Sequence, residues 1–207
     1  MKESSSTVFL VDDDLSVRVA LARLIKSRGF HVETFASAGE FLNSDWYKAQ
    51  VACLVLDVRL PDLSGLDLQR DLQTEGIALP IVFITGHGDI PMGIKAMKNG
   101  AVDFLPKPVE EDELVSAIER ALAKADHERA EQLELQDIQR RLETLTPRER
   151  EVMTWVVSGL LNKQIAFELG TVEKTVKVHR ARVMEKMEVS SFAELVRIAE
   201  RVGIGKK

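Results

Sequence analysis

Acidic, hydroxyl and ammonium side chains stand at the ends of four short apolar segments in the first 125 residues. Asp12, Asp13 and Asp14 follow segment 7–11, Asp57 follows 52–56, Thr85 ends 80–85, and Lys107 comes just after 102–105. Carboxylates that are brought together repel one another, and a divalent cation with oxygen ligands, Mg²⁺ above all, relieves that repulsion. A carboxylate beside a bound metal can accept a phosphoryl group, with a lysine and a threonine hydroxyl to contact its oxygens.

The elements around these residues predict how they meet. Apolar segments 7–11, 31–35, 52–56, 80–85 and 102–105 alternate with helix-like segments near 15–28, 37–45, 64–75, 90–99 and from 110 onward. This alternation predicts an α/β flavodoxin-like domain with a five-stranded parallel sheet covered on both faces. Ligands of such sheets bind beyond the carboxyl ends of the strands. Each polar residue alone could serve a turn or a helix start, but their shared position favours one site.

The last 60 or so residues carry only helical patterns. Thr146-Pro147-Arg148-Glu149 is a helix start with a capping hydroxyl and a glutamate three residues later. Further helices are expected over 162–170, with Asn162 as the cap, and over 173–187 and 191–202. Two short helices joined by a glycine-containing turn are typical of an all-α helix-turn-helix domain, whose second helix enters the DNA major groove.

The helix expected over 173–187 has two distinct faces. Val176, Val183 and Met187 recur at core spacing, and His179 is expected to lie near that core with a hydrogen bond. Another face carries Lys174, Lys177, Val178, Ala181 and Arg182. Exposed valine and alanine among basic residues suit contact with thymine methyl groups, and Lys177 suits a guanine edge or a phosphate. DNA binding is favoured over a plain solvated face.

The segment between these parts has no proline or glycine from Glu110 to Arg141, which predicts a long helix. Leu135, Ile138, Leu142 and Leu145 are spaced by 3, 4 and 3 residues, and form either a coiled-coil seam or a face that packs on a neighbouring domain. The expected division is a receiver-like domain over 1–125, a helical linker over 126–143 and a helix-turn-helix domain over 144–207.

The composition of the chain indicates the cellular compartment in which it works. The chain has 207 residues, a net charge of −5 and 45% hydrophobic residues, with an acidic excess before residue 144 and a basic excess after it. It has no apolar run long enough for a membrane helix, and its start lacks the apolar core of a signal peptide. Cys53 is the single cysteine and lies in an apolar run, so we expect a buried, inert thiol and no internal disulfide. These features favour a cytoplasmic protein with no membrane partner.

The motifs of the first part resemble the receiver domain of two-component response regulators. The matching strings are FLVDDD, LVLDVRLPDLSGLDL and PIVFITGHGDIPMGIKAMKNGAVDFLPKP. The resemblance implies that Asp57 is the phosphoacceptor, that the phosphodonor is a sensor histidine kinase, and that Lys107-Pro108 is cis. It implies Mg²⁺ bound by Asp13, Asp57 and the backbone carbonyl of Arg59, with Asp12 acting through water. It further implies Thr85 and Lys107 as phosphoryl contacts, and Thr85 and Phe104 as switch residues.

The string LTPREREVMTWVVSGLLNKQIAFELGTVEKTVKVHRARVMEKMEVSS resembles the DNA-binding domain of the LuxR/NarL class. With the receiver, the whole chain looks like a FixJ-type response regulator. Such a protein is not an enzyme but a phosphorylation-dependent transcriptional regulator, here expected to be an activator. Its implied partners are double-stranded promoter DNA, RNA polymerase and a second copy of itself after phosphorylation. Thr171-Val172 departs from the usual apolar residue and Ser or Ala, so the helix cap is expected to shift to Thr171.

Two other classes stay open on the residues. A haloacid dehalogenase type of phosphohydrolase would need an aspartate two residues after the nucleophile, where this chain has Arg59. A phosphorylation-driven protein-interaction module would lack salt-dependent binding to duplex DNA. The switch also has two candidate forms. The expected one is dimerisation through 90–105, with Met92, Lys95, Lys98 and Asp103 exposed, and the contrary one is release of a masked DNA-binding domain.

Overall fold

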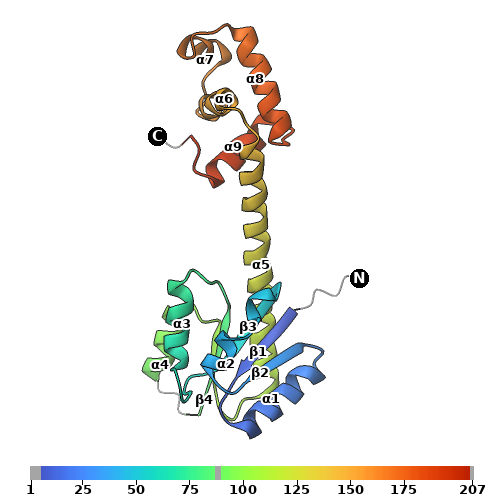
Figure 1. Cartoon of the computed structure of the whole chain (residues 1–207), viewed down its shortest axis with the longest axis vertical. Coiled ribbons are helices and arrows are strands. Elements are labelled where there is room, and N and C mark those ends of the chain that lie inside the picture. The colour runs from blue at the N-terminus through green and yellow to red at the C-terminus, as the bar shows by residue number, and fades with distance from the viewer. Residues whose placement is uncertain (1–5, 87–89, 206–207) are drawn as a thin grey trace. The chain divides into compact units, whose positions relative to one another are not determined.

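The computed structural model describes residues 6–86 and 90–205 (Figure 1). The start compared above with a signal peptide and the His87–Asp89 part of the receiver-like motif lie outside these residues. The chain forms two compact units that divide after Arg129, and the domain limits expected from the sequence stay predictions. Among the described residues, no helix is both long and apolar enough to cross a membrane.

The first unit is built on five parallel strands. They are β1 (Ser6–Val11), β2 (His31–Phe35), β3 (Val51–Asp57), β4 (Ile81–Thr85) and β5 (Asp103–Pro106), in the order β2-β1-β3-β4-β5. All neighbouring strands pair in parallel, so their carboxyl ends share one edge of the sheet. The fold is the flavodoxin-like α/β arrangement that the alternation of segments predicted.

Helices cover both faces of this sheet (Figure 1). They are α1 (Leu15–Ser27), α2 (Ala38–Leu42), α3 (Gly65–Thr74), α4 (Ile90–Lys98) and α5 (Glu111–Glu143). Because strand side chains alternate, Leu10 and Val55 pack with α1 and α5, whereas Phe9 and Leu56 pack with α2, α3 and α4. The segment expected to be helical over 37–45 ends earlier, at Leu42, and a short 3₁₀ turn, η1 (Trp46–Lys48), follows it.

The second unit contains α6 (Pro147–Val157), α7 (Asn162–Glu168), α8 (Glu173–Lys186) and α9 (Phe192–Arg201). Its core includes Met153, Ile165, Val176, Val183 and Leu195. Ile138, Leu142 and Leu145 are buried in the same core, and Leu135 is half-buried. The heptad-like residues therefore pack on the C-terminal helices, which was the second of their two expected roles.

Two predicted helix caps are wrong. Asn162 is the first residue of α7, and the position before it, Leu161, has its amide bound by the Gln164 side chain at 2.8 Å. Val172, not Thr171, precedes α8, and it gives no side-chain cap. The amide of Thr171 donates to Ala166 O at 2.9 Å, so Thr171 belongs to the turn that ends α7.

The buried Glu149 at the start of α6 forms an ion pair with the partly exposed Lys186. Thr146 and Glu149 form the predicted capping box, and Lys186 at the end of α8 donates to Glu149 Oε2 at 2.6 Å. The hydrogen bond from Lys186 and the amide of Thr146 lower the pKa of Glu149 from 4.5 to about 2. A carboxylate with a lowered pKa stabilises the fold above its ordinary pKa and stops doing so as the pH falls towards the folded value.

We predict that Glu149→Gln lowers the free energy of unfolding of the second unit by about 2 kcal/mol at pH 7, allowing for the partly exposed Lys186. The difference from wild type should narrow between pH 5 and pH 3. Urea unfolding in a Trp46→Phe background, where Trp155 reports the second unit, measures it. Glu151→Gln, which changes an exposed carboxylate of the same helix, is the control. Equal stability of Glu149→Gln and wild type at pH 7 would contradict the prediction.

Candidate functional site

Three carboxylates meet at the carboxyl edge of the sheet. Asp12 and Asp13 follow β1, and Asp57 ends β3, which is hydrogen-bonded to β1. Carboxylate oxygens of the three residues all lie within 4.8 Å of one another. Asp12 and Asp57 are buried, whereas Asp13 is exposed. The cluster thus opens to solvent on the side of Asp13.

Lys107 joins two of these carboxylates. Its Nζ lies 2.6 Å from Asp12 Oδ2 and 2.5 Å from Asp57 Oδ2. Burial opposes a charge on the lysine, but the hydrogen bonds to Asp12 and Asp57 raise the pKa of Lys107 overall. Burial raises the pKa of Asp12, and Lys107 offsets part of that rise. One ammonium group cannot neutralise three carboxylates, so the cluster keeps a negative charge.

Backbone amides fix the two buried carboxylates. The amide of Arg59 donates to Asp57 Oδ1 at 2.9 Å, and the amide of Asp14 donates to Asp12 Oδ1 at 2.9 Å. Asp14 itself caps α1 by accepting from the amides of Ser16 and Val17, which lower its pKa. Asp14 therefore serves the helix start, the alternative role that an acidic residue has at this place.

One contact of the acidic loop was missed from the sequence. Arg18 Nη1 donates to the backbone oxygen of Asp12 at 2.6 Å. The available signal was a basic residue in the second turn of the helix that follows three aspartates. The donor set of the loop consists of carboxylate oxygens with one exposed member, and such hard, partly solvated ligands fit Mg²⁺.

Thr85 and Phe104 lie on the neighbouring strands. Thr85 ends β4 and is buried, and its backbone oxygen accepts from the amide of Lys107 at 2.7 Å. The Lys107-Pro108 bond is cis. The Phe104 ring is half-buried beside Phe83, and a Cβ at Gly93 of α4 would lie 3.3 Å from its Cδ1. Phe104 thus connects β5 with the middle of α4.

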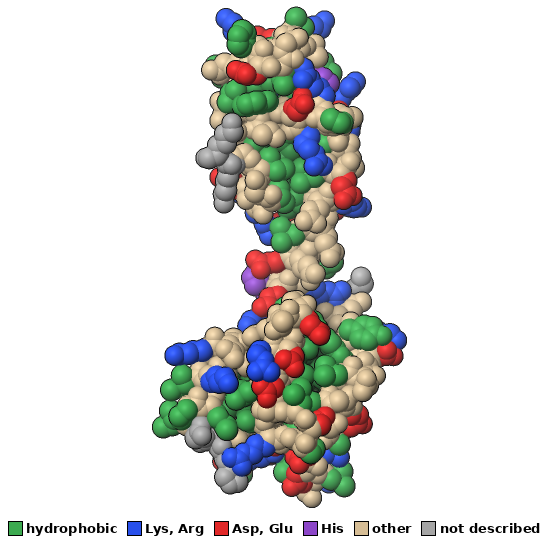
Figure 2. Space-filling model, turned by 60° about the vertical axis from the view of Figure 1, so that its left-hand side comes forward, with side chains coloured by type: hydrophobic (Ala, Val, Ile, Leu, Met, Phe, Trp, Pro, Cys, Tyr) green, Lys and Arg blue, Asp and Glu red, His purple; other side chains and the backbone are tan. Residues whose placement is uncertain are grey.

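The surface of α4 differs in part from the expectation. Lys95 and Lys98 are exposed as predicted, but Met92 is half-buried and packs on the core. Asp103 is half-buried, caps the amide of Phe104 and forms an ion pair with Arg120. The large apolar side chains of α4 that are exposed are instead Ile90, Ile94 and Met97. Hydrophobic and basic side chains lie side by side on the surface of this unit (Figure 2).

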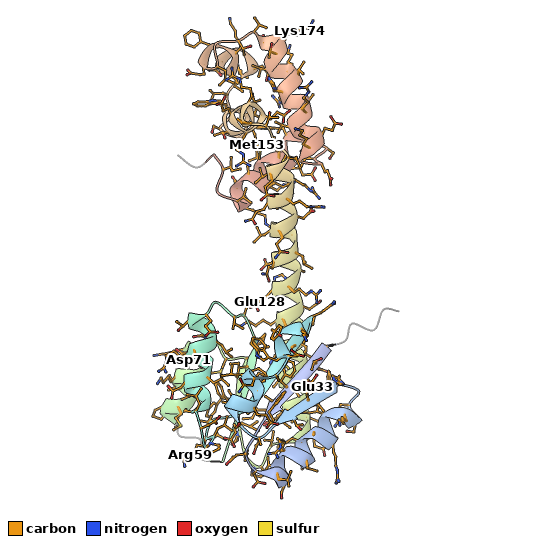
Figure 3. The ribbon with its side chains drawn as sticks, in the orientation of Figure 1. Glu33, Arg59, Asp71, Glu128, Met153 and Lys174 are labelled. Atoms are coloured by element: carbon orange, nitrogen blue, oxygen red, sulfur yellow. The ribbon has the colours of Figure 1, made fainter. Side chains whose placement is uncertain are left out.

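In the second unit, α8 presents the expected exposed face. Val176, Val183 and Met187 are buried. The five predicted side chains are all exposed: Lys174, Lys177, Val178, Ala181 and Arg182. Glu173 and Glu185 of the same helix are exposed as well, and Glu173 forms an ion pair with Lys177 at 3.1 Å. Figure 3 shows Lys174 near the start of α8, beside α7. Val178, the apolar member of this face beside Ala181, is 45% exposed.

Three further side chains, which lie outside the exposed face of α8, are Arg180, His179 and Cys53. Arg180, which was not singled out, lies 5.4 Å from the Phe192 ring and donates to Asn162 Oδ1 at 3.4 Å, so it links α7, α8 and α9. His179 is half-buried, but its Nδ1 has no hydrogen-bond partner among the described residues, contrary to expectation. Cys53 is buried, as predicted, and burial raises the pKa of its thiol to about 12.

Known proteins share both halves of this arrangement. Residues 8–119 match the response regulator receiver domain, and residues 143–199 match the luxR family of bacterial regulatory proteins. The chain is 48% identical over 202 residues to the response regulator protein TodT of Pseudomonas putida, which covers 98% of this chain and 88% of TodT. It is 45% identical over 199 residues to the transcriptional regulatory protein FixJ of Rhizobium meliloti, covering 96% and 97%.

A solved structure extends this likeness to the fold. The response regulator StyR is 48% identical, superposes with a TM-score of 0.85 and covers 95% of this chain and 99% of StyR. The receiver match alone spans more than half of the chain, and the alignment with FixJ of Rhizobium meliloti runs over nearly the whole of both chains. The chain belongs to the FixJ-type two-component response regulators, which are transcription regulators with a receiver domain and a LuxR-type DNA-binding domain.

Proposed function

We propose that this response regulator accepts a phosphoryl group on Asp57 from a sensor histidine kinase and then binds promoter DNA as a dimer. The observation that carries the proposal is the meeting of Asp57 with Asp12, Asp13 and Lys107 at the carboxyl edge of the sheet. A regulator with this site and a LuxR-type domain couples a chemical signal to transcription.

The proposed transfer follows from the contacts of Asp57. An oxygen of the Asp57 carboxylate attacks the phosphorus of a phosphohistidine, the P–N bond breaks, and the imidazole leaves and takes up a proton. Lys107, already 2.5 Å from Asp57 Oδ2, and the Thr85 hydroxyl contact the phosphoryl oxygens. Asp13, Asp57 and the backbone carbonyl of Arg59 would hold Mg²⁺, with Asp12 acting through water, and the bound ion would supply charge neutralisation.

The proposed switch begins with the charge of the product. An aspartyl phosphate carries a charge of about −1.5 to −2 in place of the single charge of the Asp57 carboxylate, at a point where Lys107 already bridges Asp12 and Asp57. Thr85 turns towards the phosphoryl oxygens, and the Phe104 ring moves into the space that it leaves. Because Phe104 lies against Gly93, this movement reaches α4 and its exposed Ile90, Ile94 and Met97. We infer that this face joins two copies about a two-fold axis.

The proposed DNA contacts are the five exposed basic and apolar side chains of α8 named above. Lys177 and Val178 suit a guanine edge and a thymine methyl group, Ala181 suits an apolar base contact, and Lys174 and Arg182 suit phosphates. One helical unit of this size makes few contacts, so two units joined in a dimer bind at a high effective concentration. We further propose that the DNA-bound dimer activates transcription through contact with RNA polymerase. The phosphohydrolase alternative lacks its second aspartate, because Arg59 occupies that position.

The first prediction concerns the phosphoacceptor. Asp57→Asn should take up no label from radioactive acetyl phosphate with Mg²⁺, because the attacking carboxylate oxygen is gone. Asp71→Asn, an exposed carboxylate of α3, should be labelled as strongly as wild type. Undiminished, acid-stable labelling of Asp57→Asn would show that another residue is phosphorylated.

The second prediction concerns α8. Lys177→Ala should weaken binding to a promoter fragment by about 1–3 kcal/mol, and Arg182→Ala should weaken it and lower the slope of the salt dependence by about 1. Arg140→Ala removes an exposed charge from α5 and should leave binding unchanged, since 135–145 is not expected to contact DNA. Fluorescence anisotropy over a range of salt concentrations measures all three. Wild-type binding by both α8 variants would refute the assignment of this face.

The third prediction concerns the switch. Sedimentation velocity should find mainly monomer before phosphorylation and dimer after it. Ile94→Glu should be phosphorylated normally but stay monomeric, because it places a charge in the proposed interface. An unchanged mass of the phosphorylated wild type, together with stronger DNA binding, would instead favour release of a masked DNA-binding domain.

A further inference from the structure

Asp62 connects two loops at the carboxyl edge of the sheet. It lies in the loop between β3 and α3, and its Oδ2 accepts from the amide of Gly39 at 2.7 Å. Its Oδ1 accepts from the amides of Ala38 at 3.3 Å and Leu63 at 3.0 Å. Ala38 and Gly39 are the first residues of α2. A carboxylate more than 20 residues further along the chain therefore binds the free amides at the start of that helix.

Asp62 and α2 depend on each other. α2 has five residues, too few to be stable without tertiary contacts. Ser37 binds the amide of Glu40 at 3.1 Å, so Asp62 supplies the other two amide contacts at the helix start. Burial opposes the charge of Asp62, but these amides lower its pKa overall. The loop after β3 is thus held on α2 by charge-assisted hydrogen bonds.

This connection completes a chain of contacts through the loops that follow β1, β2 and β3. The amide of Asp12 donates to Phe35 O at 3.2 Å, which joins the end of β1 to the end of β2. Three residues after Phe35 the chain enters α2 at Ala38, and Asp62 joins α2 to the loop that follows Asp57. That loop is held at its ends by Val58 N to Ile84 O at 3.1 Å and Gly65 N to Val58 O at 2.9 Å. Asp62 is its anchor between those ends.

Gly39 makes the close approach possible. A Cβ at this position would lie 3.1 Å from Asp62 Oδ2, closer than most Cβ contacts, and the carboxylate would have to move. Alanine is otherwise favoured over glycine in a helix by about 1 kcal/mol. Gly39→Ala therefore disturbs the contact with Asp62 while it favours the helix itself.

We propose that Asp62, seated on Gly39, is a positioning residue for the magnesium and phosphoryl site. It fixes the loop that carries Arg59 relative to Asp12 and Asp57 without contacting the ion or the phosphoryl group. The proposal rests on the proposed function, because it presumes that Asp13, Asp57 and the Arg59 carbonyl bind Mg²⁺. If Asp62 has this role, the affinity of the site for Mg²⁺ depends on the contact between α2 and the loop that joins β3 to α3.

Calorimetric titration of the full chain with MgCl₂ tests this. Asp62→Ala and Gly39→Ala should each weaken Mg²⁺ binding by about three- to tenfold, whereas Asp62→Asn, which keeps one acceptor oxygen, should fall between Asp62→Ala and wild type. Asp71→Ala removes the same charge from α3 (Figure 3) and should bind as wild type. Urea unfolding without Mg²⁺ measures the purely structural cost of each change.

The possible results distinguish the positioning role of Asp62 from the presence of the Mg²⁺ site itself. Unchanged Mg²⁺ affinity of Asp62→Ala and Gly39→Ala, with or without a loss of stability, would overturn the positioning role while leaving the metal site intact. Absence of Mg²⁺ binding by the wild type would overturn the proposed site and this inference together. If Asp62→Ala does not fold, Gly39→Ala decides alone, since it removes no polar group.

Discussion

Three carboxylates share the carboxyl edge of the sheet with one ammonium group, so negative charge is in excess there. The contacts around that edge hold these carboxylates together in spite of their repulsion. Lys107 binds Asp12 and Asp57 together, the amides of Asp14 and Arg59 each hold one carboxylate oxygen, and Arg18 holds the backbone of the acidic loop. Buried charges remain charged only where hydrogen bonds and opposite charges replace water. A site with residual negative charge and an exposed member, Asp13, is suited to a divalent cation.

The parallel sheet brings the acidic cluster together, and its strands β4 and β5 connect that cluster with the surface of the unit. Because β4 and β5 are neighbours, Thr85 and Phe104 lie on adjacent strands, and Lys107 follows β5 at the same edge. Phe104 touches α4 where glycine leaves room for its ring. In the second unit, Lys186 holds the end of α8 to Glu149 of α6, so the helix proposed to meet DNA is fixed at the end opposite to Lys174.

The sequence was sufficient to predict those features of the fold and the site that follow from a repeated pattern or from a residue type with one common role. Alternating apolar segments predicted the strands, and the aspartates after 7–11 and 52–56 predicted the carboxylate cluster, because parallel strands end at one edge. The exposed face of α8 followed from helical spacing. The domain limits and the roles of the site residues remain predictions, since they depend on phosphorylation and on DNA.

Contacts between distant segments could not be predicted in this way. The seat of Asp62 on Gly39 joins residues that no local pattern relates, and the ion pair with Arg120 that draws Asp103 inward is equally non-local. The cap of α8 was misplaced by one residue because Thr171 completes the turn after α7 instead. The cap of α7 was misplaced by one residue because Asn162 is itself the first residue of that helix. Met92 was expected at the surface, but the side of α4 that it occupies packs on Phe104 and its neighbours.

The central claim is that phosphorylation of Asp57 controls DNA binding by α8. Anisotropy titrations of one promoter fragment, chosen by its binding from genomic DNA, test it with wild type and Asp57→Asn, each with and without acetyl phosphate and Mg²⁺. The account predicts that phosphodonor raises the affinity of wild type by about tenfold or more and leaves Asp57→Asn unchanged. An equal response of the two proteins, or no response of either, would contradict it.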